Sequence, residues 1–393
     1  MLIRKPSYYD SFHCIASACT DTCCAGWEIG VDEETAARYR RLDGAMGRRI
    51  KENTVETEDG LCFVLQGERC PFLNRQNLCD LILELGEDSL CEICREHPRH
   101  YEWLGPVTEV GLGLCCEEAG RLLFGSPDPV TFLEVDESDV DGMDGAEASG
   151  DDLDGEDSDQ RCLDFLLASR MKAIAIVQNR EIPIHERLIR LLHFAEVLQD
   201  ALDLGVYELD DEAVVYAEQE EQQDKEQFDM TEVSAMNIAY FAKLLEAYAG
   251  LESLDGTWGN RMEALKPYIA DEQARNAFFH AYPEAYDFQY EYFAVYLLFR
   301  YFAKSYYDGD VLGKIQFVCM SELILMLMDF ATADKQEYSF WDRIWNAKQY
   351  SKEIEYSQDN MDTLAELCGT EEFLSPVSLR RMLWYLSAKE DKK

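Results

Sequence analysis

The chain has 393 residues, and its 78 acidic against 36 basic side chains give a formal net charge of −42. A negative field of this size repels nucleic-acid phosphates and anionic lipid headgroups and attracts lysine-rich surfaces, so we expect neither nucleic acid nor a membrane as a partner. The length suggests two domains, and the amino terminus lacks the apolar stretch of a signal peptide, which predicts a cytoplasmic protein.

Cysteine dominates the first part of the chain. Eleven of the fourteen cysteines lie between Cys14 and Cys116, in blocks carried by separated segments. Reduced thiols at this density favour a soft metal over disulfides. Four thiolates can bind Zn²⁺ or ligate an iron–sulfur cluster, and only Cys91 and Cys94 have the two-residue spacing typical of zinc knuckles. The pattern therefore predicts a metal-binding domain and leaves the metal open.

Local signals in this part predict short elements joined by loops. Residues 1–30 show no helical period, and Asp32 is expected to cap a helix of about 18 residues with one apolar stripe. Segments 61–65 and 70–73 suggest a small hairpin. Short helices are expected at 78–85, 87–97 and 117–124.

The composition changes abruptly at residues 134–159, which hold thirteen Asp or Glu and no Lys or Arg. Such a segment cannot bury enough apolar area to offset its ordering entropy, so we expect a disordered linker. The predicted domains are a cysteine-cluster metal-binding domain at 1–130, an acidic linker at 131–160, and a helical domain at 161–393 with a further acidic loop at 208–229.

Apolar periodicity beyond the linker is helical. Helices are expected at 161–178, 183–204, 231–248, 283–306 and 311–330, and no repeat of fixed period is visible. Residues 293–302 are expected to be the most apolar stretch, and they are too few to cross a membrane. The expected fold is mainly α: a small irregular cysteine-rich metal-binding domain followed by an irregular helical bundle.

Basic side chains accompany the later cysteines in an otherwise acidic chain. Arg95 and Arg99 follow Cys94, and cations beside thiolates stabilise the negative charge of a cluster. We interpret these two arginines as part of the cluster environment. The alternative is that the basic residues pair with neighbouring glutamates on helix surfaces. Cys162, Cys319 and Cys368 lie in the helical part and are expected to be ordinary buried thiols.

Several motifs resemble a known family. They are the run Phe12-His-Cys14-Ile-Ala-Ser-Ala-Cys19-Thr-Asp-Thr-Cys23-Cys24-Ala-Gly-Trp27, then Cys70-Pro-Phe-Leu73, Leu78-Cys79, Cys94-Arg95, Pro98-Arg99 and Cys116-Glu-Glu-Ala-Gly-Arg121, and softer matches in the helical half. Together they resemble the flagellin lysine-N-methylase family, whose cysteines are similar to those of zinc- or iron-chelating domains.

The resemblance implies a [4Fe-4S] cluster and methyl transfer from S-adenosylmethionine to lysine side chains of flagellin. The cysteines that match position by position are Cys14, Cys19, Cys23, Cys24, Cys70, Cys79, Cys94 and Cys116. Cys91 and Cys115 stand where serine is expected, and Glu117 stands where proline is usual. Eight candidates exceed the four ligands of one cluster, and no catalytic residue is implied. The alternative function is a non-enzymatic zinc- or iron-binding scaffold.

Overall fold

The computed structural model describes residues 2–22, 24–25, 29–57, 60–67, 69–136, 157–208, 212–227, 233–254 and 256–386. The chain divides into two compact units. The first, the cysteine unit, comprises residues 1–125, 131–149 and 348–356. The second, the helical unit, comprises residues 126–130, 150–347 and 357–393. The chain therefore returns to the cysteine unit near its carboxyl end, which the predicted boundaries did not anticipate.

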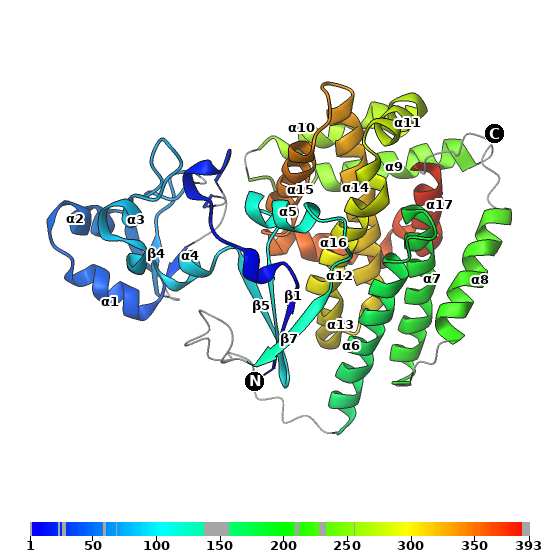
Figure 1. Ribbon diagram of the computed structural model, residues 1–393, viewed down its shortest axis with the longest axis horizontal. Coiled ribbons are helices and arrows are strands. Elements are labelled where there is room, and N and C mark those ends of the chain that lie inside the picture. Colours follow the sequence, from blue (N-terminus) through cyan, green and yellow to red (C-terminus); the bar gives the residue numbers. More distant parts are fainter. Residues whose placement is uncertain are drawn as a thin grey trace. The chain divides into compact units, whose positions relative to one another are not determined.

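A four-stranded sheet forms one part of the cysteine unit. Its strands are β1 (Leu2–Pro6), β5 (Arg99–Leu104), β6 (Val107–Leu112) and β7 (Phe132–Asp136), in the order β5-β6-β1-β7. β1 runs parallel to β6 and antiparallel to β7. Strands β1, β5 and β7 of this sheet are labelled in Figure 1. Helix α5 (Glu117–Phe124) contributes to the core of this sheet through Ala119, beside Ile3 and Val110.

A three-stranded sheet forms the other part, with β2 (Gly30–Val31), β3 (Thr54–Thr57) and β4 (Gly60–Phe63) in the order β2-β4-β3. Four helices accompany it: α1 (Glu33–Arg41), α2 (Gly44–Glu52), α3 (Asp80–Leu85) and α4 (Glu92–Glu96). Their apolar side chains share one core with the sheet, in which Tyr39, Ile50 and Phe72 are at most 2% exposed.

The predicted 18-residue helix is wrong in its length but right at its start. The Asp32 side chain accepts a hydrogen bond from the Thr35 N–H, as an N-cap should. The helix ends after α1, because Leu42 and Asp43 have an extended backbone, with ψ of 128° and 176°, and Gly44, with a φ of +83°, then begins α2. At Gly47 an added Cβ would lie 2.2 Å from the Leu42 carbonyl oxygen, so the turn between α1 and α2 packs tightly.

Two other predictions for this unit need correction. β4 pairs with β3 and β2 and not with residues 70–73, although Gln66 and Arg69 do pair across the turn that the sequence predicted. Strands β1, β5 and β6 were not predicted. The pairing of β1 with β6 joins segments about a hundred residues apart, whereas β5 and β6 pair with each other locally, up to Leu104 and Val107. The short helices expected at 78–85 and 117–124 are confirmed as α3 and α5, and α4 is shorter than expected.

The helical unit confirms the predicted bundle. Its helices are α6 (Asp157–Val177), α7 (Ile184–Asp203), α8 (Glu212–Gln227), α9 (Val233–Ala249), α10 (Trp258–Glu263), α11 (Glu272–Ala281), α12 (Tyr290–Tyr301), α13 (Ser305–Asp308), α14 (Val311–Ala333), α15 (Phe340–Ile354), α16 (Gln358–Thr370) and α17 (Pro376–Leu386). Helices α6, α7 and α8 lie side by side (Figure 1). The last residues of α15, from Lys348, belong to the cysteine unit.

Helix α14 is the core of this bundle and packs against α7, α11, α12, α16 and α17. Nearly all of its own residues are buried and most are apolar, as expected for a helix that is covered on every face. By length and composition it could cross a membrane, but 83% of its most apolar window is buried within the protein. It is longer and more apolar than residues 293–302, which the sequence analysis took as the most apolar stretch.

The acidic segments also differ from expectation. Residues 132–136 form β7 and α6 begins at Asp157, so both ends of the predicted 131–160 linker are ordered. Residues 137–156 lie outside the described part of the chain, and their disorder stays a prediction. The acidic loop expected at 208–229 is mostly wrong, because Glu212–Gln227 form α8. Helix α8 buries Ala213 and Ala217 in the core, so one side of this polar segment packs against the rest of the unit.

Candidate metal centre

The cysteine side chains of the first unit gather in two groups. The larger, the Cys94 group, consists of Cys24, Cys70, Cys79, Cys91 and Cys94. Cys70 and Cys91 are buried in the core beside the three-stranded sheet, and Cys79 and Cys94 pack against that core. Cys24 comes from the first block, yet its charge reaches Cys70, Cys79 and Cys94 and raises their pKa values, after the larger effect of burial or of a thiol hydrogen bond. Four of the eight predicted ligands are therefore neighbours.

Short helices position two of these thiols. Cys91 precedes the first turn of α4 and Cys94 lies within it, so the two face the same side. Their thiols are joined by a hydrogen bond, which lowers the pKa of Cys91 and raises that of Cys94. Cys91 stands where the family resemblance implied serine, but its position makes it a member of the thiol group.

The smaller group, the Cys19 group, consists of Cys14, Cys19 and Cys116. Cys14 and Cys19 flank a short turn of 3₁₀ helix, and Cys116 immediately precedes α5. Burial raises the pKa of Cys19 to about 12, with added repulsion from Glu117 and Cys116. Burial likewise raises the pKa of Cys14, and both Cys116 and Cys24 add to the effect. The loop from Cys19 to Cys24 thus supplies thiols to both groups.

Glu117 ties this loop to the start of α5. Its carboxylate accepts hydrogen bonds from the Thr20 N–H at 2.9 Å, the Thr20 hydroxyl at 2.7 Å and the Asp21 N–H at 2.9 Å. Burial alone would raise the pKa of Glu117, but these bonds and the charge of Lys348 bring it below its usual value. A proline at this position could make none of these contacts, so the departure from the family pattern has a structural role here.

Lys348 completes the arrangement from the far end of the sequence. Its side chain is fully buried, and its Nζ donates to Glu117 Oε1 and to the Asp21 carbonyl oxygen, both at 3.0 Å. Nζ also lies 3.2 Å from the Asp21 carboxylate. Lys352, one turn later, reaches the same carboxylate at 3.3 Å and the Thr22 carbonyl at 3.4 Å. Among the charges acting on Cys19, that of Lys348 opposes the rise in its pKa.

The remaining cysteines of this unit are placed differently. Cys115 is fully buried and hydrogen-bonded to the Tyr356 hydroxyl, which fits its expected role as a bystander. Cys62 lies on β4 near the Thr57 hydroxyl. Cys23, one of the eight predicted ligands, lies outside the described residues.

The two predicted arginines contact aromatic rings and a carboxylate. The guanidinium of Arg99 stacks over the rings of Tyr9 and Phe12, at 6.0 and 5.2 Å from their centroids. Arg95 is half exposed and lies 3.6 Å from Glu96. Their part in a cluster environment stays a prediction, and Lys348 is a further cation whose charge acts on Cys19.

The donor chemistry of these residues fits an iron–sulfur cluster or another thiophilic metal. The described cysteines are all free thiols, and the Cys94 group offers sulfur from three separate segments. Within the described residues, no three Cys, His, Asp or Glu side chains converge closely enough to hold a single ion. The arrangement therefore gathers ligands of the right kind without enclosing one ion.

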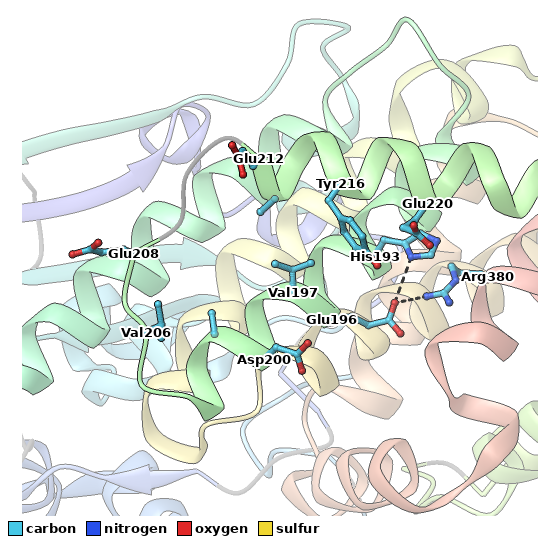
Figure 2. A pocket seen from close by; sticks show the side chains of 12 residues that line it. His193, Glu196, Val197, Asp200, Val206, Glu208, Glu212, Tyr216, Glu220 and Arg380 are labelled. Carbon is cyan, nitrogen blue, oxygen red and sulfur yellow. Dashed lines mark hydrogen bonds and ion pairs between the residues drawn. The ribbon is translucent and has the colours of Figure 1, made fainter.

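The helical unit contains a separate cavity of about 930 Å³ between α7 and α8. Figure 2 shows His193, Glu196 and Arg380 pointing toward one another at its wall. His193 Nε2 lies 2.8 Å from Asp224, and Arg380 donates to Glu196 at 2.7 Å. Burial would lower the pKa of His193, but these carboxylates raise it. Carboxylates line much of this cavity, and no thiol is among its described lining residues.

Comparison with known proteins gives the family. A model described as the FliB lysine N-methylase C-terminal domain matches residues 170–381, more than half of the chain. The chain belongs to this family. The matched range covers most of the helical unit and also contains Lys348 and Lys352, which contact the cysteine unit's loop.

Individual relatives agree with this family. A "Flagellar biosynthetic protein FliU" of Salmonella muenchen is 29% identical over 34% of this chain and 82% of its own length. A "Lysine-N-methylase" of Salmonella typhimurium and another of Salmonella choleraesuis are 28% identical over 34% of this chain and 35% of their own lengths. No solved structure matches the chain. The family and these names class the chain with the lysine N-methylases.

Sequence reasoning found the cysteines but missed the side chains that position their loop. Lys348 and Glu117 are 231 residues apart, so no spacing rule connects them. One signal was available: Lys348 and Lys352 are spaced four apart on a helix of a strongly acidic chain, which places two cations on one face. That face could have been expected to meet carboxylates elsewhere in the protein.

Proposed function

We propose that this protein transfers methyl groups from S-adenosylmethionine to lysine side chains of flagellin, and that its cysteines hold an iron–sulfur cluster. The observation that carries the proposal is the family match over residues 170–381, in a chain whose amino-terminal thiols form two neighbouring groups. The flagellar name of one relative supports flagellin as the substrate. The alignment covers 35% of each lysine-N-methylase, so the activity is carried over as a proposal.

The chemistry of methyl transfer sets requirements for the site. A lysine amine must be neutral to attack a methyl group, and removal from water lowers its pKa toward that form. Attack would form the N–C bond as the S–C bond of S-adenosylmethionine breaks, and the amine would then release a proton. The net charge of −42 would favour the approach of a lysine-bearing substrate.

We assign the cluster to Cys24, Cys70, Cys79 and Cys94, because these are the predicted ligands that neighbour one another within the larger group. A bound cluster would supply redox or Lewis-acid chemistry, or a structural staple if all its irons are fully ligated. Cys91 is the adjacent thiol that could replace one of the four. Cys14, Cys19 and Cys116 form the competing set.

The test begins with protein purified without oxygen. We expect a brown protein with iron and sulfide in equal amounts, and incorporation of labelled methyl groups into flagellin lysines, identified by mass spectrometry. Cys94→Ala should remove both iron and methylation. Cys162→Ala is the matched control, because Cys162 lies in the helical unit. This variant should retain both iron and methylation. Colourless protein containing stoichiometric zinc and transferring no methyl groups would instead support the scaffold function.

A further inference from the structure

We propose that Lys348 is a positioning residue for the loop that carries Cys19 and Cys24, described at residues 19–22 and 24, and that it holds this loop against the first turn of α5. The loop carries Cys19 and Cys24, one thiol for each cysteine group. Its peptide groups point inward to a single buried centre formed by Glu117 and Lys348. The inference concerns the placement of thiols, and it rests on the proposed function only for the identity of the metal they bind.

The contacts of the Lys348 ammonium group explain why one side chain can fix this loop. An ammonium group has three N–H donors, and here three acceptors lie within 3.2 Å: the Asp21 carbonyl, the Asp21 carboxylate and Glu117. Asp21 belongs to the loop and Glu117 to α5, so the lysine bridges two segments that are distant in sequence. A fully buried cation must have such partners, because an unpaired charge would be very unfavourable there.

The bridge is closed on its other side by the loop itself. Glu117 accepts from the Thr20 and Asp21 N–H groups, so the loop backbone both donates to the carboxylate and accepts from the ammonium. Thr22 then accepts from the Cys24 N–H through its hydroxyl at 3.0 Å. The position of Cys24 therefore follows from that of Asp21 and Thr22, and both depend on contacts from α15.

Lys348 is better placed than its neighbour to perform this function. The Lys352 side chain is 16% exposed, and its two contacts to the loop are 3.3 and 3.4 Å long. In the described structure the contacts of Lys352 are to Asp21 and Thr22 of the loop, whereas Lys348 contacts both the loop and Glu117 of α5. Replacement of the two lysines should consequently have unequal effects.

The first test measures hydrogen exchange in the full chain, without metal or S-adenosylmethionine. Lys348→Met keeps the length of the side chain and removes its charge and donors. We expect exchange in the segment 14–24 to accelerate at least tenfold, while segments 70–85 and 91–96 of the same molecule keep their wild-type rates. Lys348→Arg should restore most of the protection, and Lys352→Met should change it less than threefold.

The second test follows the metal. After anaerobic reconstitution with iron and sulfide, Lys348→Met should bind less than half the wild-type cluster, judged by iron content and visible absorption, and Lys348→Arg should recover it. Unchanged exchange in segment 14–24 would overturn the proposal. Equal acceleration in all three segments would also overturn it, because Lys348 would then only stabilise the whole unit. Since the exchange measurement needs no methylation, a failure of the proposed function would be seen separately.

Discussion

Each unit contains a buried charged centre, and the two are built differently. In the helical unit, Asp329 of α14 accepts hydrogen bonds from Tyr290, Tyr338 and Asn346 and is paired with Arg343 at 2.8 Å. Three of these partners, Tyr290, Arg343 and Asn346, lie on the helices α12 and α15. In the cysteine unit, the partners of the charged centre are largely the N–H and carbonyl groups of a loop. Helices hold the first centre in place, whereas the second centre holds its own loop in place.

This difference predicts how much of each unit loses stability when one buried charge is removed. Removing a charge from inside the bundle leaves its counter-charge unpaired among packed helices, so the whole unit should lose stability. Removing a charge from the loop centre releases only the segment that depends on it. Hydrogen exchange can measure both, because it reports local opening free energies in each unit of one chain.

The largest effect is expected for Asp329→Ala. The change leaves the fully buried Arg343 without its anion and removes the acceptor for three hydrogen bonds. Loss of one partner of a buried pair costs about 3–5 kcal/mol, and the opening free energy of α14 should fall by that amount. Asp334→Ala, at the exposed end of the same helix, is the control and should change it by less than about 1 kcal/mol. A small effect of Asp329→Ala would mean that the helical frame does not depend on this charge.

The second effect is a pH dependence in the helical unit. Glu322 of α14 is fully buried, and burial raises its pKa well above the usual 4.5, since Arg343 offsets only part of the cost. A raised acid pKa gives stability that is present below pH 4.5 and lost as the pH rises toward the folded value. Glu322→Gln should therefore stabilise the unit by up to about 1.4 kcal/mol per pH unit above 4.5, and should have no such effect near pH 4. Denaturant unfolding of both proteins at pH 4, 5, 6 and 7 measures this, and a constant difference across the series would contradict it.

The third effect is confined to the cysteine unit. Glu117→Ala removes the acceptor for the Thr20 and Asp21 N–H groups and the anion beside Lys348. Leaving partly buried donors unpaired costs about 1–3 kcal/mol, so protection in segment 14–24 should fall by about that amount while α14 is unchanged. Glu118→Ala is the matched control: its carboxylate pairs with the half-exposed Arg121 on the same helix, which is worth at most about 1 kcal/mol. Loss of protection in both variants alike would show that α5 itself has been disturbed.

The same comparison explains what the sequence could predict. The Asp32 cap, helix α5 and the bundle helices follow from signals within a few residues, and the blocks of cysteines indicated a shared site. The break at Leu42 and Asp43 was missed because a helical stripe continues across it, and only the extended backbone there rules out one helix. The parallel pairing of Leu2 with Val107 and the contact of Lys348 with Glu117 depend on segments that meet only in the folded chain. The predictions were therefore most accurate for the helices of the helical unit. They were least accurate for the loops of the cysteine unit, whose positions depend on side chains from distant segments.

The smallest effect compares one helix cap from each unit. In the helical unit, Asp310 accepts one hydrogen bond, from Gly313 of its own helix, at 2.8 Å. In the cysteine unit, Asp32 accepts from Thr35 of α1 at 2.8 Å and also from the Glu92 N–H at the start of α4 at 2.9 Å, so it joins two helices that carry part of one core. Loss of a cap costs about 1 kcal/mol, so Asp310→Ala should lower stability by about that much, and Asp32→Ala by about 2 kcal/mol, because a second donor loses its partner. Exchange in segment 91–96, which contains Cys91 and Cys94, should accelerate in Asp32→Ala and not in Asp310→Ala. If each variant accelerated exchange only in its own helix, the hydrogen bond from Glu92 to Asp32 would not stabilise α4. Side-chain contacts between segments would then matter less in the cysteine unit than we propose.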